Sequence, residues 1–163
     1  MKYYLVILSL AHVIKCGKEP LIINGETAEI RQFPHSAYLN VGCLRNKSGW
    51  NCGASILNQM IMLTAAHCVD GCTGGITSIV SVGHRHIHRG TASSVHSIYF
   101  HKKYGSFDFA YDIALMKLKT NLNFSMNIQR VALMQRPPYF ERAQVAGWGD
   151  TEVNYILSYY ILN

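Results

Sequence analysis

The stretch Ile61–Cys68 constrains the fold most, because an apolar run leads directly into a histidine. Ala65 and Ala66 are small, so the backbone can pack closely before His67, and Cys68 could anchor the far side through a disulfide. These features predict a buried strand that holds an imidazole at its end. Because histidine titrates near neutral pH, a held imidazole suits general-base chemistry. Taken alone, the same pattern also fits a histidine with a purely structural role in the core.

Three further motifs change this balance. The four are Ile22-Ile23-Asn24-Gly25-Glu26, Thr64-Ala65-Ala66-His67-Cys68, Tyr111-Asp112-Ile113-Ala114-Leu115 and Ala146-Gly147-Trp148-Gly149. Their order and spacing resemble the trypsin/chymotrypsin family of serine endopeptidases. The motif that ends at His67 and Cys68 is highly specific for this family. The resemblance runs from about Ile22 to Thr151 and implies an all-β fold of trypsin-like Greek-key barrels, with the first barrel complete and the second truncated.

The length of the chain sets the expected domain boundaries. A two-barrel protease needs roughly 200–250 residues as one unit, whereas residues 22–163 number 142. We therefore expect an incomplete trypsin-like domain over residues 22–163. Before it, Lys2 and the apolar residues 3–10 predict a signal peptide over 1–17, cut at a point between Ala11 and Gly17, and residues 18–21 form a short propeptide. The apolar run is too short for a membrane anchor, so we expect a secreted, extracellular protein.

The composition excludes several classes of function. With 49% hydrophobic and 15% charged residues, the chain is globular rather than disordered. Its net charge is +6, and 12 basic and 8 acidic residues remain from Ile22 onwards, a net +4 without any block of Lys or Arg. Acidic partners are favoured only weakly and nucleic acid is unsupported. By resemblance, the expected partners are a polypeptide substrate and protease inhibitors, with no membrane span, no cofactor and no metal.

The resemblance implies catalytic roles for two residues. His67 is the general base, and Asp112 accepts a hydrogen bond from its Nδ1–H and fixes its tautomer. A carboxylate among apolar neighbours costs free energy unless it is hydrogen-bonded, although an aspartate there could instead cap a turn. The family's nucleophilic serine lies in a Gly-Asp-Ser-Gly-Gly stretch that this sequence lacks. Because Gly149-Asp150-Thr151 belongs to the tryptophan motif, Thr151 is not expected to replace it.

Without the nucleophile, residues 1–163 by themselves are predicted to be an inactive part of a serine-type endopeptidase. The alternative is a secreted, non-catalytic, protease-like fragment that acts by binding.

Four of the five cysteines are expected to pair. By resemblance, Cys52 and Cys68 form the disulfide that closes the histidine loop. Cys43 and Cys72 are extra, and because each is expected in a surface loop near the histidine, we predict that they pair. Cys16 is left over, and no CxxC-type cluster with a partnering histidine indicates zinc.

Ile22 resembles the family's mature N-terminus, which is freed by proteolysis. Leu21 departs from the basic residue that a trypsin-like activator cuts after, and the buried aspartate that pairs with the freed amino group belongs to the missing half. Both points argue against zymogen activation by this route.

Other patterns make weaker suggestions. Asn46 and Asn123 begin N-glycosylation sequons. His84, His86 and His88 have period two, so on a strand they would share one face and could bind zinc or copper; a solvated strand or loop face is the simpler interpretation. Since Asp70 and Asp108 are the only acids between Glu29 and Asp112, a calcium site is not expected.

The tail over residues 153–163 is apolar and aromatic. We expect it to depart from the family after the tryptophan motif and, with no second barrel, to have nothing to bury against, so that its strand edges invite association.

Overall fold

The computed structural model describes residues 26–45, 47–72, 75–108, 110–136, 142–149 and 157–162. Strands dominate these residues, and the three helices among them are short 3-10 turns. None of the helices in these ranges has the length and apolar character needed to cross a membrane. In chain order the elements are β1 (Glu26–Thr27), η1 (Ile30–Gln32), β2 (Ser36–Cys43), β3 (Gly49–Ile56), β4 (Ile61–Thr64), η2 (Ala66–Cys68), β5 (Ile76–Val82), η3 (Ile87–Arg89), β6 (Thr91–Phe100), β7 (Ala114–Leu118), β8 (Ala143–Gly147) and β9 (Ser158–Leu162).

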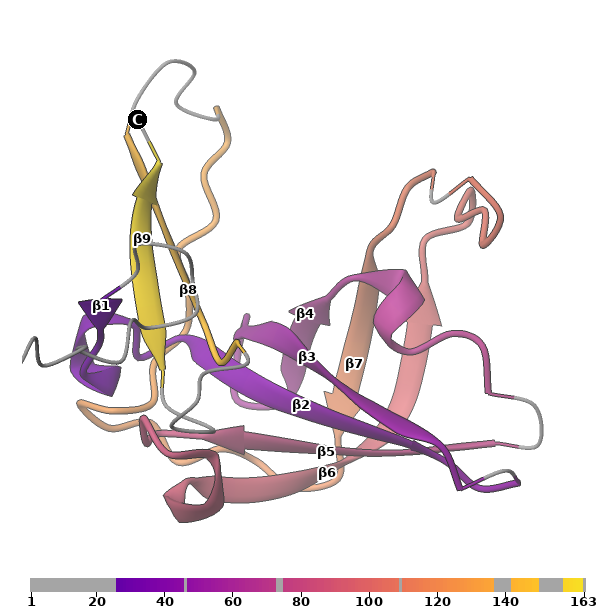
Figure 1. The fold of residues 1–163 in the computed structure, drawn as a ribbon, viewed down its shortest axis with the longest axis horizontal. Helices are drawn as coiled ribbons and strands as arrows, with labels where there is room; N and C mark the ends of the chain where they lie inside the picture. The colour runs from indigo at the N-terminus through magenta and orange to yellow at the C-terminus, as the bar shows by residue number, and fades with distance from the viewer. Residues whose placement is uncertain are drawn as a thin grey trace, which may run out of the picture.

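Six strands close into a barrel in the order β2-β3-β4-β7-β6-β5, and all neighbours are antiparallel. The chain leaves β4, forms β5 and β6 on the far side, and returns as β7 beside β4 (Figure 1). This return over non-adjacent strands makes the barrel a Greek key. The expected all-β, Greek-key barrel is confirmed.

Alternation along the strands explains why these segments form a barrel. In β7, Ala114, Met116 and Leu118 are buried, whereas Leu115 and Lys117 between them are exposed. The side chains of a strand point to opposite faces in turn, so this pattern directs one face inwards. The interior also contains Leu39, Val41, Ile56, Met62, Val80 and Val82, all fully buried.

A second, smaller sheet stands beside the barrel in the order β1-β9-β8, with the yellow β9 strand in the middle (Figure 1). It has its own apolar cluster, formed by Ala28, Ile30, Phe33 and Leu157. Leu157 is fully buried and its backbone carbonyl accepts a hydrogen bond from Ala28 N at 2.9 Å. The expectation that the tail has nothing to bury against is therefore wrong. Its partners lie at the start of the domain, more than a hundred residues away in the sequence.

The small sheet is attached to the barrel through the loop between β5 and β6. The Trp148 indole Nε1–H donates to the Arg85 carbonyl oxygen at 2.6 Å, and Leu157 N donates to the same oxygen at 3.0 Å. The ring of Trp148 also packs edge-on against Tyr38, with ring centroids 6.0 Å apart. Tyr38 lies on β2, so these contacts join β8 and the residue before β9 to the barrel wall.

The loop that carries His84, His86 and His88 is not a strand. It bends after Gly83, which has a φ of +81°, and enters the 3-10 helix η3 at Ile87. The rings of His84 and His86 have centroids 5.6 Å apart, but His88 lines a different hollow, together with Tyr38 and Asn40. The shared strand face on which a three-histidine metal site would depend is therefore absent from this loop.

Candidate active site

The pairing of β4 with β7 brings His67 and Asp112 together. These strands are antiparallel with Thr64 opposite Ala114. His67 comes three residues after Thr64, and Asp112 comes two residues before Ala114. Both residues therefore extend from the same end of the strand pair, although they are 45 residues apart in the sequence.

Both carboxylate oxygens of Asp112 bind His67. Asp112 Oδ2 lies 2.7 Å from the imidazole Nδ1, and Oδ1 accepts a hydrogen bond from the His67 backbone N–H at 2.8 Å. An ionised carboxylate can only accept hydrogen bonds, so Nδ1 carries the proton and the lone pair of the neutral ring is on Nε2. About half of the His67 side chain is exposed (49%), compared with 25% for Asp112.

The same contacts favour the ionised form of Asp112. The hydrogen bond from the His67 ring is the largest influence that lowers the pKa of the Asp112 carboxyl, and the His67 backbone N–H adds to it. Partial desolvation opposes this change, whereas the charge of His67 and the Ala66 backbone reinforce it. A carboxylate held ionised beside an imidazole fixes the ring orientation and stabilises the imidazolium form.

The two disulfides flank this site. The structure joins Cys52 to Cys68 and Cys43 to Cys72, the two pairings expected from the sequence. The first joins β3 to η2 directly beside His67. The second, with Cα atoms 5.3 Å apart, joins the end of β2 to the loop after η2. The chain that follows His67 is therefore covalently attached to the barrel at two points, Cys68 and Cys72.

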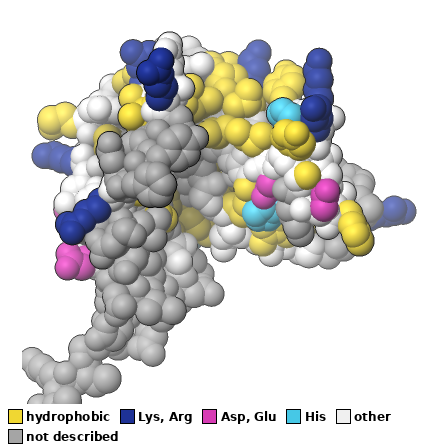
Figure 2. Space-filling model, turned by 90° about the horizontal axis from the view of Figure 1, so that it is seen from above, with side chains coloured by type: hydrophobic (Ala, Val, Ile, Leu, Met, Phe, Trp, Pro, Cys, Tyr) yellow, Lys and Arg dark blue, Asp and Glu magenta, His cyan; other side chains and the backbone are white. Residues whose placement is uncertain are grey.

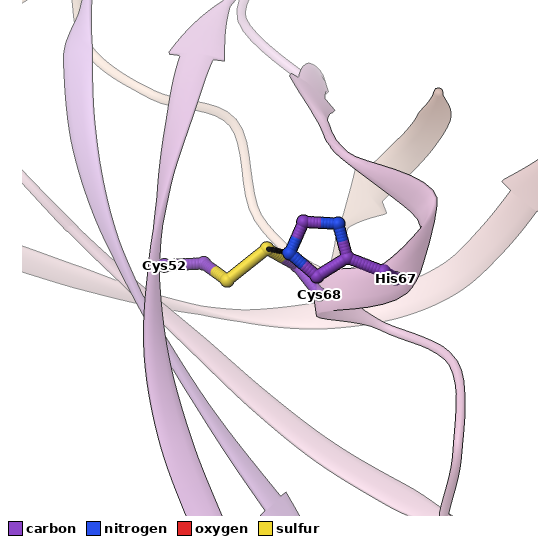
Figure 3. A group of neighbouring side chains, drawn as sticks. All are labelled: Cys52, His67 and Cys68. Carbon is purple, nitrogen blue, oxygen red and sulfur yellow. Dashed lines mark hydrogen bonds between the residues drawn. A yellow bond between two sulfur atoms is a disulfide. The ribbon is translucent and has the colours of Figure 1, made fainter. Parts of the chain in front are cut away.

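The sulfur atoms beside His67 resemble a metal site but cannot act as one. The potential ligand atoms of Cys52, His67 and Cys68 all lie within 4.8 Å of one another, with His67 Nε2 at 3.5 Å from Cys68 Sγ (Figure 3). Zinc requires thiolates, and both sulfurs are consumed by the disulfide bond. Over the described ranges, His84, His86 and His88 do not form a three-ligand group.

A strained residue precedes Asp112. Tyr111 has a φ of +53°, the left-handed region that bulky residues rarely adopt. Its ring stacks on His101 with centroids 4.8 Å apart, and Lys103 Nζ lies 5.6 Å from the ring centroid. The Ile113 N–H also donates to the Tyr111 carbonyl at 2.7 Å, across Asp112. These contacts hold the turn that presents Asp112, and sequence analysis missed them because nothing local marks Tyr111 as left-handed.

Tyr104 is a second residue that sequence analysis missed. Burial, and then the negative charges of Asp70 and Asp112, raise the pKa of its hydroxyl. The ring stacks on Phe100 with centroids 5.8 Å apart and packs against the barrel core. Tyr104 therefore supports the site from the loop that follows β6.

Beside the site, a hollow of about 530 Å³ lies between the barrel and β8, with Leu63, Asp112, Ile113 and Val145 among its lining residues. In Figure 2, one histidine lies beside acidic and hydrophobic side chains, and a second histidine lies next to Lys or Arg side chains. The hollow opens an approach to Asp112 between the two sheets.

The other predicted site residues fall in different places. Asn123 is exposed after β7, where a glycan could be attached. Ile22, Asn46 and Thr151 lie outside the described residues, as do the signal peptide and the propeptide.

Comparison with known proteins decides the family. A family model described as "Trypsin" matches residues 22–162. The chain belongs to the trypsin family. Because the match continues past Thr151 into β9, the expectation that the chain departs from the family after the tryptophan motif is wrong.

Individual relatives agree with this assignment. "Serine protease snk" of Drosophila melanogaster is 33% identical over 144 residues, which cover 82% of this chain and 32% of that protein. "Hypodermin-B" of Hypoderma lineatum is 30% identical over 136 residues, which cover 82% of this chain and 51% of that protein. The chain thus spans between a third and about half of the length of these relatives.

Solved structures show the same fold. The HL collagenase structure superposes with a TM-score of 0.74 at 28% identity, covering 85% of this chain and 61% of that one. An inactivated protease paralogue of the scabies mite, S-D1, superposes with a TM-score of 0.70 at 21% identity, covering 84% and 60%. The second likeness is one of fold alone.

Proposed function

We propose that this chain supplies the histidine and aspartate of the catalytic centre of a secreted, trypsin-type serine endopeptidase. The observation that supports this most is the double contact of Asp112 with the ring and the backbone of His67. It orients the ring and leaves the basic lone pair on Nε2. His67 would remove the proton of a serine hydroxyl and later return it to the leaving amine.

The proposal places the nucleophile outside residues 1–163, because this sequence has no Gly-Asp-Ser-Gly-Gly stretch. The catalytic serine and the amides of the oxyanion hole together account for most of the rate enhancement in such enzymes. Residues 1–163 by themselves are therefore proposed to cleave no peptide bond. Two disulfides close to the site are consistent with an oxidising, extracellular environment.

The test compares two proteins in a peptide-cleavage assay: residues 1–163, and the product obtained when the natural transcript is read beyond the codon for Asn163. We expect cleavage only by the longer product, with His67→Ala in that product lowering kcat by at least about 10⁴-fold. His96→Ala is the matched control, since His96 is exposed on β6, at the end of the β6–β7 pair away from Asp112. If a stop codon follows Asn163 and the secreted 163-residue product is stable, a binding role replaces the catalytic one.

A measurement on the histidine itself requires no nucleophile. In ¹⁵N NMR spectra of residues 1–163, neutral His67 should carry its proton on Nδ1, and Asp112→Asn should shift the tautomer towards Nε2–H. An unchanged tautomer in that variant would contradict the role of Asp112.

A further inference from the structure

Basic residues that are far apart in the sequence meet at a hollow beside η1 and the loop between β5 and β6. This basic hollow has a volume of about 460 Å³. One arginine comes from η1 and the other two from the loop and η3. The charged or titratable residues that line it are Glu29, Arg31, His84, Arg85, His86 and Arg89.

The positive charge of the basic hollow is only partly neutralised. Glu29 is its single acidic lining residue within the described ranges, and its Oε1 lies 2.7 Å from Arg85 Nη1. This ion pair is solvent-exposed, with 38% of the arginine and 66% of the glutamate side chain accessible, so water weakens it. Arg31 donates from Nε to the neutral Asn127 side chain at 3.2 Å. The hollow is therefore lined by three guanidinium groups and one carboxylate.

The loop that carries these charges is held in one shape by its own hydrogen bonds. His86 N donates to His84 Nδ1 at 2.9 Å, and Arg89 N donates to the His86 carbonyl at 3.0 Å. Ser81 Oγ donates to the carbonyl of the buried Ile87 at 2.6 Å. A loop ordered in advance loses less conformational entropy when a ligand binds.

His86 reports the electrostatic character of the hollow. Burial lowers the pKa of its imidazole, and the positive charges of Arg85, Arg89 and His84 lower it further, against a smaller opposing influence of Glu29. The hollow thus disfavours additional positive charge, and a bound anion would reverse this effect.

We propose that the basic hollow binds a tetrahedral oxyanion, the phosphate or sulfate group of an ester, held by Arg31, Arg85 and Arg89. A guanidinium group can donate two parallel, charge-assisted hydrogen bonds to the oxygens of such an anion. Three guanidinium groups line the hollow, and a phosphate or sulfate ester offers them three acceptor oxygens, whereas a carboxylate offers two. The volume lies within the range of about 300–1,000 Å³ typical of ligand pockets and leaves room for the group that carries the ester. None of the three arginines belongs to the site of His67 and Asp112. This inference therefore goes beyond the proposed function and is tested independently of it.

The test is a titration of the 163-residue chain with inorganic phosphate and with sulfate at low ionic strength, followed by NMR of the amides in residues 84–89. We expect saturable shifts there and binding about tenfold weaker in Arg89→Gln, because a charge-assisted hydrogen-bond pair is lost. Arg45→Gln is the matched control: it removes the same charge from an exposed turn after β2, and less than about a twofold change is expected. Equal weakening in both variants would show a net-charge effect only and overturn the proposal.

A second variant, expected to strengthen binding, keeps the proposal testable if Arg89→Gln fails to fold. Glu29→Gln removes the competing carboxylate and should tighten binding, whereas weaker or unchanged binding would contradict the proposal. With sulfate, whose charge does not change in this range, binding should also tighten as the pH falls through the pKa of His86, since the anion favours the protonated imidazole; Glu29, Arg31, His84, Arg85 and Arg89 are the charged or titratable groups around that ring. Phosphoserine and a 6-sulfated monosaccharide then distinguish the two ester sources. Saturable binding of either supports the proposal, and binding of neither overturns it.

Discussion

The closed barrel and the three-stranded sheet use the same antiparallel pairing but differ in how their edges end. Every barrel strand has two neighbours, so the barrel has no open edge. In the small sheet, β1 and β8 are outer strands, each paired on one side within the described residues. Among the residues whose side chains the structure describes, 15 buried residues form the barrel core and four form the apolar cluster of the small sheet. The barrel also contains both disulfides.

The two regions therefore differ in role: the barrel holds the candidate catalytic residues, and the small sheet is attached beside them. His67 and Asp112 extend from β4 and β7, inside the region with the larger core and the covalent links. The small sheet contributes one wall of the hollow beside Asp112. Stability within a protein follows local burial, so we expect the small sheet to open first while the pair of His67 and Asp112 stays assembled.

The largest expected effect comes from breaking the barrel core. Met116 is fully buried opposite Met62 in the register of β4 and β7. Met116→Ala should lower the free energy of unfolding by about 2–5 kcal/mol, because it leaves a cavity. Urea denaturation followed by circular dichroism measures this loss. Lys117→Ala, on the exposed face of the same strand, should change it by less than about 0.5 kcal/mol, and a similar loss in both variants would contradict the barrel as the stable unit.

A smaller, local effect is expected in the other region. Leu157→Ala truncates a fully buried side chain in the apolar cluster of the small sheet and should cost about 2 kcal/mol, at the low end for Leu→Ala because an open site can collapse. Hydrogen exchange should become faster for amides of β8 and β9 and stay unchanged in β2–β7. If the barrel amides accelerate equally, the two regions unfold as one cooperative unit and the distinction between them fails.

The smallest effect concerns the pH dependence of stability. The pKa of Asp112 is lower in the folded chain than its ordinary value of 3.8. Its ionised form therefore stabilises the fold above about pH 4, and this contribution is lost as the pH falls through the lowered pKa. Asp112→Asn should flatten the acid side of the curve of unfolding free energy against pH. An acid slope identical to that of the unchanged chain would show that Asp112 contributes nothing to it.

The parts of the site that lie in short contiguous motifs could be predicted from the sequence. The segment around His67 and the residues around Asp112 each stand in one short stretch, and the family resemblance supplied the link between them. The structure adds the physical reason for that link, which is the antiparallel register with Thr64 opposite Ala114. The catalytic roles themselves stay predictions.

Other features escaped prediction because they depend on long-range placement. Leu157 was expected to lack a partner, but it packs against residues 28–33 from the other end of the domain. The arginines looked scattered until the fold placed Arg31 beside residues 84–89. The spacing of His84, His86 and His88 suggested a strand face, whereas the chain turns into η3 there. In each case the deciding partner is distant in the sequence or the turn leaves no local signature.

The Arg85 carbonyl oxygen accepts hydrogen bonds from both Trp148 and Leu157, so it is a shared attachment point for the two strands of the small sheet next to these residues. Trp148 directly follows β8 and Leu157 directly precedes β9. If β8 and β9 tilt together as a rigid unit, either both hydrogen bonds break or the Arg85 peptide moves with them. The same residue contributes its side chain to the basic hollow. The hydrogen bonds from Trp148 and Leu157 therefore join the small sheet to the same residue whose side chain lines the basic hollow.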